Sequence, residues 1–341
     1  MALLPVATLD EKHPTPDAAL TDLAHLLKGG GDPLRLAILQ VLGLGSFGVL
    51  ELGEIFGQKQ PAISHHLKVL AQTGLVTARR EGNAIFYRRA LPQADDPAGP
   101  VQEALFAALD ALPHAAEANA NIERIRAERA EVCRAFFARH TDDFRERQDL
   151  IAEYRQYADG ARDLLLAAQL PPTAEVLEVG PGAGEYLAEL AGRYAKVWGF
   201  DISEGLLSKA RARIDTDGLT NVTLVAGDTK AALARHLAVD AVVFNMVLHH
   251  VPSPADLFRD AAKLLKPGGV MLVTDLSRHE QDWVRAHCGD LWQGFDDAEL
   301  DGWARTAGFI AGNSFYLGLR NGFQVLFRSF SVPLANAFSH H

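Results

Sequence analysis

The sequence predicts two domains: a small helical domain with a β-hairpin, then a larger α/β domain with a mostly parallel, seven-stranded sheet. Two observations carry this prediction. Up to about residue 112, short amphipathic helices alternate with tight turns and are followed by two β-rich runs around the turn "EGNA". From about residue 173, short apolar runs alternate with helical segments, and two final strand-like runs predict an antiparallel edge.

Length and composition fit this organisation. A chain of 341 residues that is 48% hydrophobic can bury two cores. Two cysteines, Cys133 and Cys288, cannot form a disulfide framework or a four-thiolate zinc site. No apolar run approaches the ~18 residues that a membrane helix needs, and the N-terminus lacks the basic and apolar regions of a signal peptide. We therefore expect a reduced, cytoplasmic protein without a membrane segment.

Changes in composition along the chain predict four segments. Residues 1–18 are rich in Pro and Asp and are expected to be a disordered tail. Residues 19–115 form the first domain and residues 116–170 a charged helical linker, which ends at two prolines. Residues 171–332 form the α/β domain. The terminal "SHH" is either native or a remnant of a tag.

The first domain has the pattern of a winged helix-turn-helix. A short helix, "VLELGEIFG", is followed by "QPAISHHLKVLAQTG", in which Pro61 opens a helix and Gly74 ends it. The hairpin behind it is the predicted wing. The whole chain has a net charge of −10, but between Lys59 and Arg89 six basic residues accompany a single acidic one. A local basic patch on an acidic chain favours a small DNA-binding module.

Glycines mark a candidate ligand-binding loop in the second domain. In "EVGPGAGEYL", Gly180, Gly182 and Gly184 lie between a predicted strand and a predicted helix, where a tight turn lets the backbone approach a ligand. The next strand ends at Asp201 and the third at Asp228. All three features fall at strand carboxyl ends, where open α/β sheets bind ligands.

The motifs "LEVGPGAG", "GFDIS", "VAGD", "FNMVLHHV" and "LLKPGGVMLVTD" occur in order across about 100 residues, within a predicted domain of about 160 residues. This series resembles class I S-adenosylmethionine-dependent methyltransferases. The resemblance implies a Rossmann-like fold that binds S-adenosylmethionine or S-adenosylhomocysteine, with Glu178 near the methionine amino group, Asp201 on the ribose and Asp228 on the adenine. The predicted cofactor-binding residues are Glu178, Gly180, Pro181, Gly182, Gly184, Asp201, Ile202, Gly227, Asp228, Asn245 and Met246, with Tyr157 of the linker as part of a lid.

The run "QPAISHHLKVLAQTGLVTARREGNAIFYRRA" resembles the winged-helix repressors of the ArsR/SmtB type over roughly residues 20–112. The resemblance implies a homodimer that binds palindromic double-stranded DNA, with the fourth helix in the major groove. We expect Gln60, Ser64 and His65 to reach the DNA, and Lys68 shares their helix face. Arg79, Arg80 and Arg88 are expected near phosphates.

Metal binding is not expected from the sequence. The repressor resemblance places thiolate ligands in the third helix, where this chain has Gly48 and Leu50. The neighbouring His65 and His66 point about 100° apart on a helix and are poorly placed to chelate one ion. His66 is expected to pack, with base reading as the alternative.

Two functions remain open from the sequence. One is a regulator that senses S-adenosylmethionine or S-adenosylhomocysteine and controls genes of the methionine cycle. The other is a small-molecule methyltransferase with an autoregulatory DNA-binding domain. A DNA or protein methyltransferase is a weaker third possibility. Resemblance to amino-methylating DNA enzymes would require N/D-P-P-Y/F at the end of the fourth strand, where this chain has "NMVL". His249 is the candidate general base, and a place at the cofactor rim is the alternative for this residue.

Overall fold

The computed structural model describes residues 16–82, 84–92 and 96–334. The chain divides into two compact units: the first runs to Ala118 apart from Arg80–Ile85, and the second comprises Arg80–Ile85 and the chain from Asn119 onwards. Most of the predicted tail and the terminal "SHH" lie outside the described residues. The first helix begins at Pro16, before the predicted end of the tail. Within the described residues, we find no helix with the length and apolar character to span a membrane.

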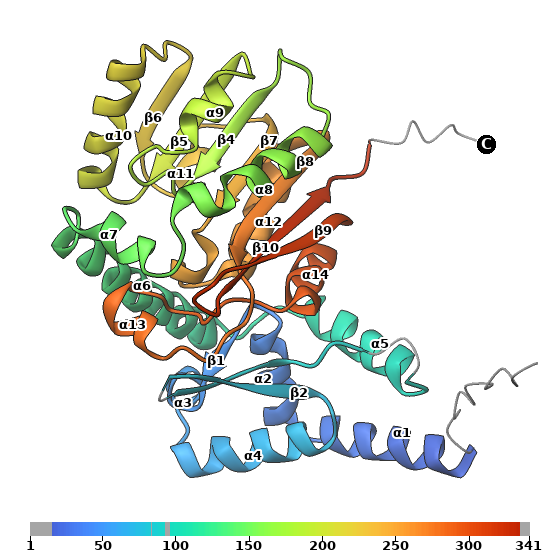
Figure 1. Cartoon of the computed structure of the whole chain (residues 1–341). Coiled ribbons are helices and arrows are strands. Elements are labelled where there is room, and N and C mark those ends of the chain that lie inside the picture. The colour runs from blue at the N-terminus through green and yellow to red at the C-terminus, as the bar shows by residue number, and fades with distance from the viewer. Residues whose placement is uncertain (1–15, 83, 93–95, 335–341) are drawn as a thin grey trace, which may run out of the picture. The chain divides into compact units, whose positions relative to one another are not determined.

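The first unit has the predicted order of helices followed by a hairpin (Figure 1). Its helices are α1 (Pro16–Gly30), α2 (Pro33–Leu42), α3 (Val49–Phe56), α4 (Gln60–Gln72) and α5 (Gly99–Asp110). Its strands are β1 (Phe47–Gly48), β2 (Val76–Glu81) and β3 (Ala84–Arg89), which form one sheet in the order β1-β3-β2. The two-residue strand β1 is not apparent in the sequence, because so short a segment carries no periodicity.

Local signals explain where these helices start and stop. The side chain of Asp32 accepts a hydrogen bond from the backbone N–H of Arg35 at 3.0 Å, and Pro33 occupies the first helical position of α2. Gly57 ends α3 in the left-handed conformation, with φ of 61°. In α4, Ile63, Leu67 and Leu70 are fully buried, as their spacing predicts. That apolar face orients the opposite face of α4 outward.

The second unit is built on the predicted seven-stranded sheet, with strand order β6-β5-β4-β7-β8-β10-β9. The strands are β4 (Glu175–Val179), β5 (Lys196–Asp201), β6 (Val222–Ala226), β7 (Val239–Asn245), β8 (Leu265–Leu276), β9 (Ile310–Gly318) and β10 (Gln324–Ser331). The strands β4 to β8 pair in parallel, whereas β10 pairs antiparallel with both β8 and β9. The predicted antiparallel edge is therefore confirmed.

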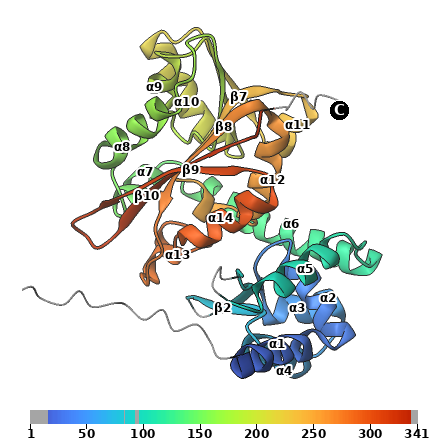
Figure 2. The same cartoon turned by 90° about the vertical axis from the view of Figure 1, so that its right-hand side faces the viewer.

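Helices cover the sheet (Figures 1 and 2). They are α9 (Leu187–Ala191), α10 (Glu204–Asp217), α11 (Thr229–Ala234), α12 (Pro254–Leu264), α13 (Trp283–His287) and α14 (Asp297–Thr306), with a short 3-10 turn, η1 (Leu248–His250). Side chains of α9 and α10 share a buried cluster with inward residues of β4, β5 and β7, whereas α12 packs against α11 and α14. The strand order reverses at β4 and β7, which opens a crevice at their carboxyl ends.

The predicted helical linker, residues 116–170, is three helices rather than one. These are α6 (Ala116–Arg139), α7 (Phe144–Asp149) and α8 (Tyr154–Ala167). The first break, between Arg139 and Phe144, includes Thr141, whose hydroxyl donates to the carbonyl of Phe137 at 2.8 Å. Such side chains compete with the helical backbone. The second break precedes Glu153, which begins α8 with its backbone N–H bonded to the Gln156 side chain. α8 then packs on β8, β9 and β10.

Candidate functional site

A cavity of about 370 Å³ lies in the second unit at the carboxyl ends of the parallel strands. The loops after β4, β5, β6 and β7 each contribute lining residues, among them Gly180, Asp201, Asp228 and Met246. Residues of α6 form a further wall. The position agrees with the crevice that the reversed strand order creates.

The glycine-rich loop after β4 needs glycine for different reasons at each position. Gly180 has φ of 73°, and a Cβ atom there would lie 2.4 Å from Cγ2 of Val247. Gly182 has φ of 55°, but a Cβ atom there would meet nothing within 4 Å. Gly184 has φ of 81° and packs against Ala210 of α10. Gly180 and Gly184 therefore serve close packing, while Gly182 lies beside open space that a ligand can fill.

Asp201 joins the glycine loop to the end of β5. Its carboxylate accepts hydrogen bonds from the backbone N–H groups of Gly182 at 3.0 Å and Ser203 at 2.8 Å. Burial raises the pKa of Asp201 to about 6, although these backbone donors favour the ionised form. The group lines the cavity, so it can accept hydrogen bonds from a hydroxyl-bearing ligand.

Glu178 is a buried acid directly beneath this loop. It is 2% exposed, and its Oε2 atom has no hydrogen-bond partner. Burial raises the pKa of Glu178 to about 8, and the nearby Asp201 and Glu185 add to the shift. A buried acid without a partner is costly when ionised, so a ligand cation at this position would be favoured.

Helix α6 is fixed to the segment that follows β7. The Cys133 thiol donates to the carbonyl of His250 at 2.9 Å, and Arg129 donates to the carbonyl of Pro252 at 3.0 Å. The ring of Phe137 lies edge-on to that of His250, with centroids 5.3 Å apart. Ala127 and other small or apolar side chains of α6 line the cavity. The α6 side of the cavity therefore includes apolar side chains, although charged residues of the same helix line it too.

The two histidines of η1 have different surroundings. His249 is fully buried, and its Nδ1 atom lies 2.7 Å from Oδ1 of Asp275. Burial alone would lower the pKa of His249, but Asp275 and Asp290 raise it to about 9. Burial and the neighbouring His249 lower the pKa of His250, and only His250 lines the cavity. A base must reach its substrate, so the role predicted for His249 stays a prediction that its burial does not favour.

The structure brings together about half of the predicted cofactor residues. Those that line the cavity are Gly180, Gly182, Asp201, Ile202, Gly227, Asp228 and Met246. Those that are not among the lining residues are Glu178, Pro181, Gly184, Asn245 and Tyr157. The predicted lid residue Tyr157 lies instead in the buried cluster of the second unit, with its ring 5.5 Å from that of Tyr154. Its part in a lid stays a prediction.

The sequence interpretation missed the contribution of α6. The α6 residues that line the cavity are Glu123, Arg126, Ala127, Ala130, Cys133, Arg134 and Phe137. Their spacing of three and four residues places them on one helix face. This spacing could have identified the helix face that lines the cavity. However, the face mixes charged and apolar side chains, so it does not stand out as the apolar face of an amphipathic helix.

The predicted DNA-contacting residues lie on α4 and the hairpin. Gln60, His65 and Lys68 are exposed and Ser64 is half-buried, so the predicted face of α4 is accessible. His66 is half-buried, 3.8 Å from Asp32. Of the hairpin arginines, Arg80 is exposed and Arg88 half-buried, whereas Arg79 is only 6% exposed. The phosphate contact expected of Arg79 stays a prediction that its burial does not favour.

Replacing Gly180 and Gly182 separately tests the packing of the loop. Gly180→Ala should lower the free energy of unfolding of the second unit by about 2–5 kcal/mol, because a left-handed alanine costs about 1–2 kcal/mol and overpacking against Val247 about 1–3 more. Gly182→Ala carries only the backbone cost and is the matched control. Urea unfolding followed by circular dichroism measures both, and equal losses would contradict the assignment.

Comparisons with known proteins agree with this geometry. The family described as "Bacterial regulatory protein, arsR family" matches residues 32–78, and the family described as "Methyltransferase domain" matches residues 147–310. Ubiquinone biosynthesis O-methyltransferases of Hydrogenovibrio crunogenus and Thiobacillus denitrificans are 31% and 35% identical to this chain over 151 and 116 residues. These matches cover 40% and 34% of the chain, and the chain spans 61% and 50% of the relatives.

The N-terminal part has a relative that it covers more fully. The Biofilm growth-associated repressor of Agrobacterium fabrum is 39% identical over 94 residues, which are 28% of this chain and 77% of the repressor. The chain therefore belongs to the arsR family of bacterial regulatory proteins, and it carries a class I methyltransferase domain behind its winged helix.

Proposed function

We propose that this chain is a DNA-binding transcriptional regulator whose methyltransferase domain binds S-adenosylmethionine or S-adenosylhomocysteine and thereby controls genes of the methionine cycle. The observation that carries the proposal is the cavity, which combines the glycine loop, Asp201 and Asp228 at the switch point of the sheet. A chain that has both this cavity and a winged helix is suited to couple a nucleoside ligand to DNA binding.

The lining residues suit the parts of an adenosyl ligand. Asp201 is placed to accept hydrogen bonds from the ribose hydroxyls. Ile202 keeps 40% of its surface exposed and lines the cavity, so it offers an apolar face to the adenine. Asp228 caps α11 through the backbone N–H groups of Lys230 and Ala231, which fixes its carboxylate at the adenine end. Glu178 is the proposed partner of the methionine ammonium.

Helices α6 to α8 are proposed as the cofactor lid and the link between the two activities. α6 begins at Ala116, just beyond α5 of the first unit, and its later turns line the cavity. A ligand that contacts Ala130 or Phe137 therefore acts on a helix that is covalently continuous with the winged-helix unit. We propose that occupancy of the cavity shifts the position of α6 and so the affinity for DNA.

The proposal includes a homodimer on a palindromic operator, with half-sites about one helical turn, ~34 Å, apart. Dimer contacts are assigned to α1 and α5. Support comes from Leu20, Leu27 and Leu112, which are large apolar side chains that remain 56–65% exposed in this part of the chain. Large apolar side chains that stay exposed in a single copy favour an interface.

A small-molecule methyltransferase with an autoregulatory DNA-binding domain is the second candidate. The observation that favours it is the group of apolar side chains that line the cavity, among them Phe137, Phe144 and Leu257. Such a lining offers room for an acceptor beside the cofactor, and two relatives are named as O-methyltransferases. S-adenosylmethionine supplies an activated methyl group, and the residues of this chain would position the acceptor against it.

An effect of the S-adenosyl ligand on DNA affinity distinguishes the regulator from the methyltransferase. The probe is a DNA fragment selected by the full chain from a random-sequence pool, and its affinity is measured at fixed salt. Saturation with S-adenosylmethionine or S-adenosylhomocysteine should change that affinity by at least about fivefold. Asp201→Asn should abolish the change at the same ligand concentration, whereas Asp217→Asn, at an exposed position, should retain it. An unchanged affinity in the wild type, with saturation verified by calorimetry, would exclude the sensor function.

Ligand binding should depend on pH through Glu178. With a pKa near 8 the empty site is protonated at pH 7, and an ammonium needs the carboxylate, so binding must release a proton. Affinity for S-adenosylhomocysteine should therefore rise up to about tenfold per unit between pH 6 and 8, then level off. The pKa of Glu178 is higher in the folded protein than in the unfolded chain. The free energy of unfolding of the ligand-free protein should therefore fall as the pH rises from about 4.5 to 8.

Calorimetry in buffers of different ionisation enthalpy counts the released proton directly. Glu178→Gln should remove most of the pH dependence between pH 6 and 8. Glu280→Gln, at an exposed position, should leave it intact. If the affinity of Glu178→Gln for S-adenosylhomocysteine rises with pH as steeply as that of the wild type, Glu178 does not bind the ammonium.

The exposed face of α4 generates a prediction about DNA affinity. Lys68→Ala should weaken binding to all sequences and reduce the slope of log affinity against log salt by about 1, because one phosphate contact is lost. Lys263→Ala, an exposed lysine near the end of α12, is the matched control and should leave the slope unchanged. Fluorescence anisotropy at several salt concentrations measures both, and identical slopes would remove α4 from the interface.

A further inference from the structure

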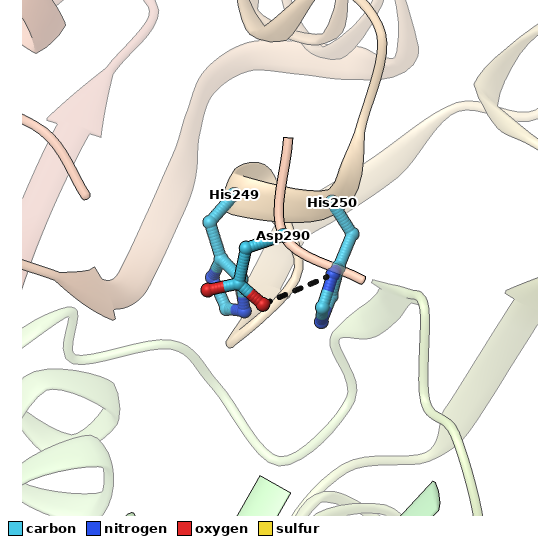
Figure 3. A group of neighbouring side chains, drawn as sticks. All are labelled: His249, His250 and Asp290. Atoms are coloured by element: carbon cyan, nitrogen blue, oxygen red, sulfur yellow. Dashed lines mark ion pairs between the residues drawn. The ribbon is translucent and has the colours of Figure 1, made fainter. Parts of the chain in front are cut away.

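Three buried side chains beside the cavity have no role in the function proposed above. His249 and His250 belong to η1, and Asp290 lies in the segment between α13 and α14 (Figure 3). Their exposures are 0%, 4% and 2%. The backbone N–H groups of Leu291 and Trp292 donate to the carbonyl of His249 at 2.8 and 3.1 Å. These bonds hold the segment of Asp290 against η1.

The ligand atoms of the three side chains lie close together. One ligand atom from each lies within 4.8 Å of the other two, and Nδ1 of His250 is 3.7 Å from Oδ1 of Asp290. Nε2 of His249 and both carboxylate oxygens of Asp290 are buried without a hydrogen-bond partner. A buried carboxylate is costly unless a cation or a donor compensates it. Either a proton on His249 or a bound metal ion can supply this compensating charge.

Outer contacts hold both rings in orientations that suit a metal. Nδ1 of His249 lies 2.7 Å from Asp275, whose carboxylate also accepts from the backbone N–H of Leu248 at 2.8 Å. When Nδ1–H donates to Asp275, the lone pair of Nε2 faces the cluster. Histidines that bind metals usually donate their other ring N–H to a carboxylate or carbonyl in this way.

His250 can adopt the matching tautomer. Its Nε2 atom lies 2.8 Å from the side-chain amide of Gln148, and the oxygen and nitrogen of an amide are interchangeable by rotation. With the amide oxygen accepting from Nε2–H, Nδ1 is free to bind an ion and gives up its 3.3 Å contact with the carbonyl of Gly289. Each histidine then offers one nitrogen to the centre.

We propose that His249, His250 and Asp290 form a binding site for one divalent transition-metal ion of the zinc class. Two imidazole nitrogens and one carboxylate favour zinc or a similar ion over magnesium or calcium, which prefer oxygen ligands. Ligands about 2.0–2.2 Å from a tetrahedral ion are roughly 3.4 Å apart. The His250–Asp290 pair at 3.7 Å is near this spacing, whereas ligand atoms as far apart as 4.8 Å would have to move closer. Three protein ligands leave a fourth position open, and His250 also lines the cavity. This site does not depend on the proposed S-adenosyl ligand.

The test uses the full chain after treatment with a chelator. Zinc titrated by calorimetry should bind with a stoichiometry near one, and cobalt(II) in its place should give the intense visible absorption of a four-coordinate ion. Asp290→Asn and His250→Gln should each weaken zinc binding at least about tenfold. The matched controls, Asp142→Asn and His287→Gln, are at exposed positions and should bind zinc as the wild type does.

Two further measurements keep the test decisive if the ligand variants fold poorly. Gln148→Ala changes a half-buried residue that only orients His250, and it should weaken zinc binding while circular dichroism remains native. Zinc should also raise the thermal midpoint of the wild type in proportion to the logarithm of its concentration. The proposal is overturned if the wild type binds no ion, if cobalt shows only the weak spectrum of a six-coordinate aqua ion, or if Asp290→Asn binds zinc as the wild type does. The three groups would then be a proton-bridged cluster.

Discussion

The reversal of strand order between β4 and β7 is the constraint on which the second unit depends. Because β5 and β6 follow β4 on one side and β7 and β8 lie on the other, the connecting loops diverge at the carboxyl edge. The crevice that results is the place where Gly180, Asp201 and Met246 meet. A sheet wound in one direction would cover this edge with its own crossovers. The cavity is thus a consequence of topology, and the side chains determine only what it can bind.

The same edge collects buried acidic groups. Glu178 lies in β4 just before the glycine loop, and Asp201 lies at the end of β5. Asp275 and Asp290 lie near η1, and all four are buried. Each loses hydration on folding, so its charge requires a donor, a cation or a proton. Asp201 and Asp275 obtain backbone donors, whereas Glu178 and Asp290 each retain an oxygen without a partner. These unsatisfied groups are where a bound ammonium or a metal ion would stabilise the protein most.

Helix α6 gives the chain a feature that its two folds do not provide separately. It follows the winged-helix unit directly in sequence, and its later turns are fixed to the segment after β7 by Cys133 and Arg129. The cavity is therefore lined by a helix whose first residues directly follow the winged-helix unit in sequence. Both proposed ligands would lie near this contact, since His250 accepts the Cys133 hydrogen bond and also lines the cavity. Regulation through α6 would need no separate connecting element.

The sequence by itself determined the order of elements, the helix-turn-helix with its wing, the seven strands and the turn glycines. These features depend on local periodicity and on backbone conformations that only certain residues adopt, as at Ile63, Leu67 and Gly180. The tertiary structure alone decided that α6 lines the cavity, that Tyr157 is in the core, and that Asp290 lies beside His249. Those contacts link segments that are remote in sequence, and no local pattern encodes which distant side chain a folded sheet brings alongside.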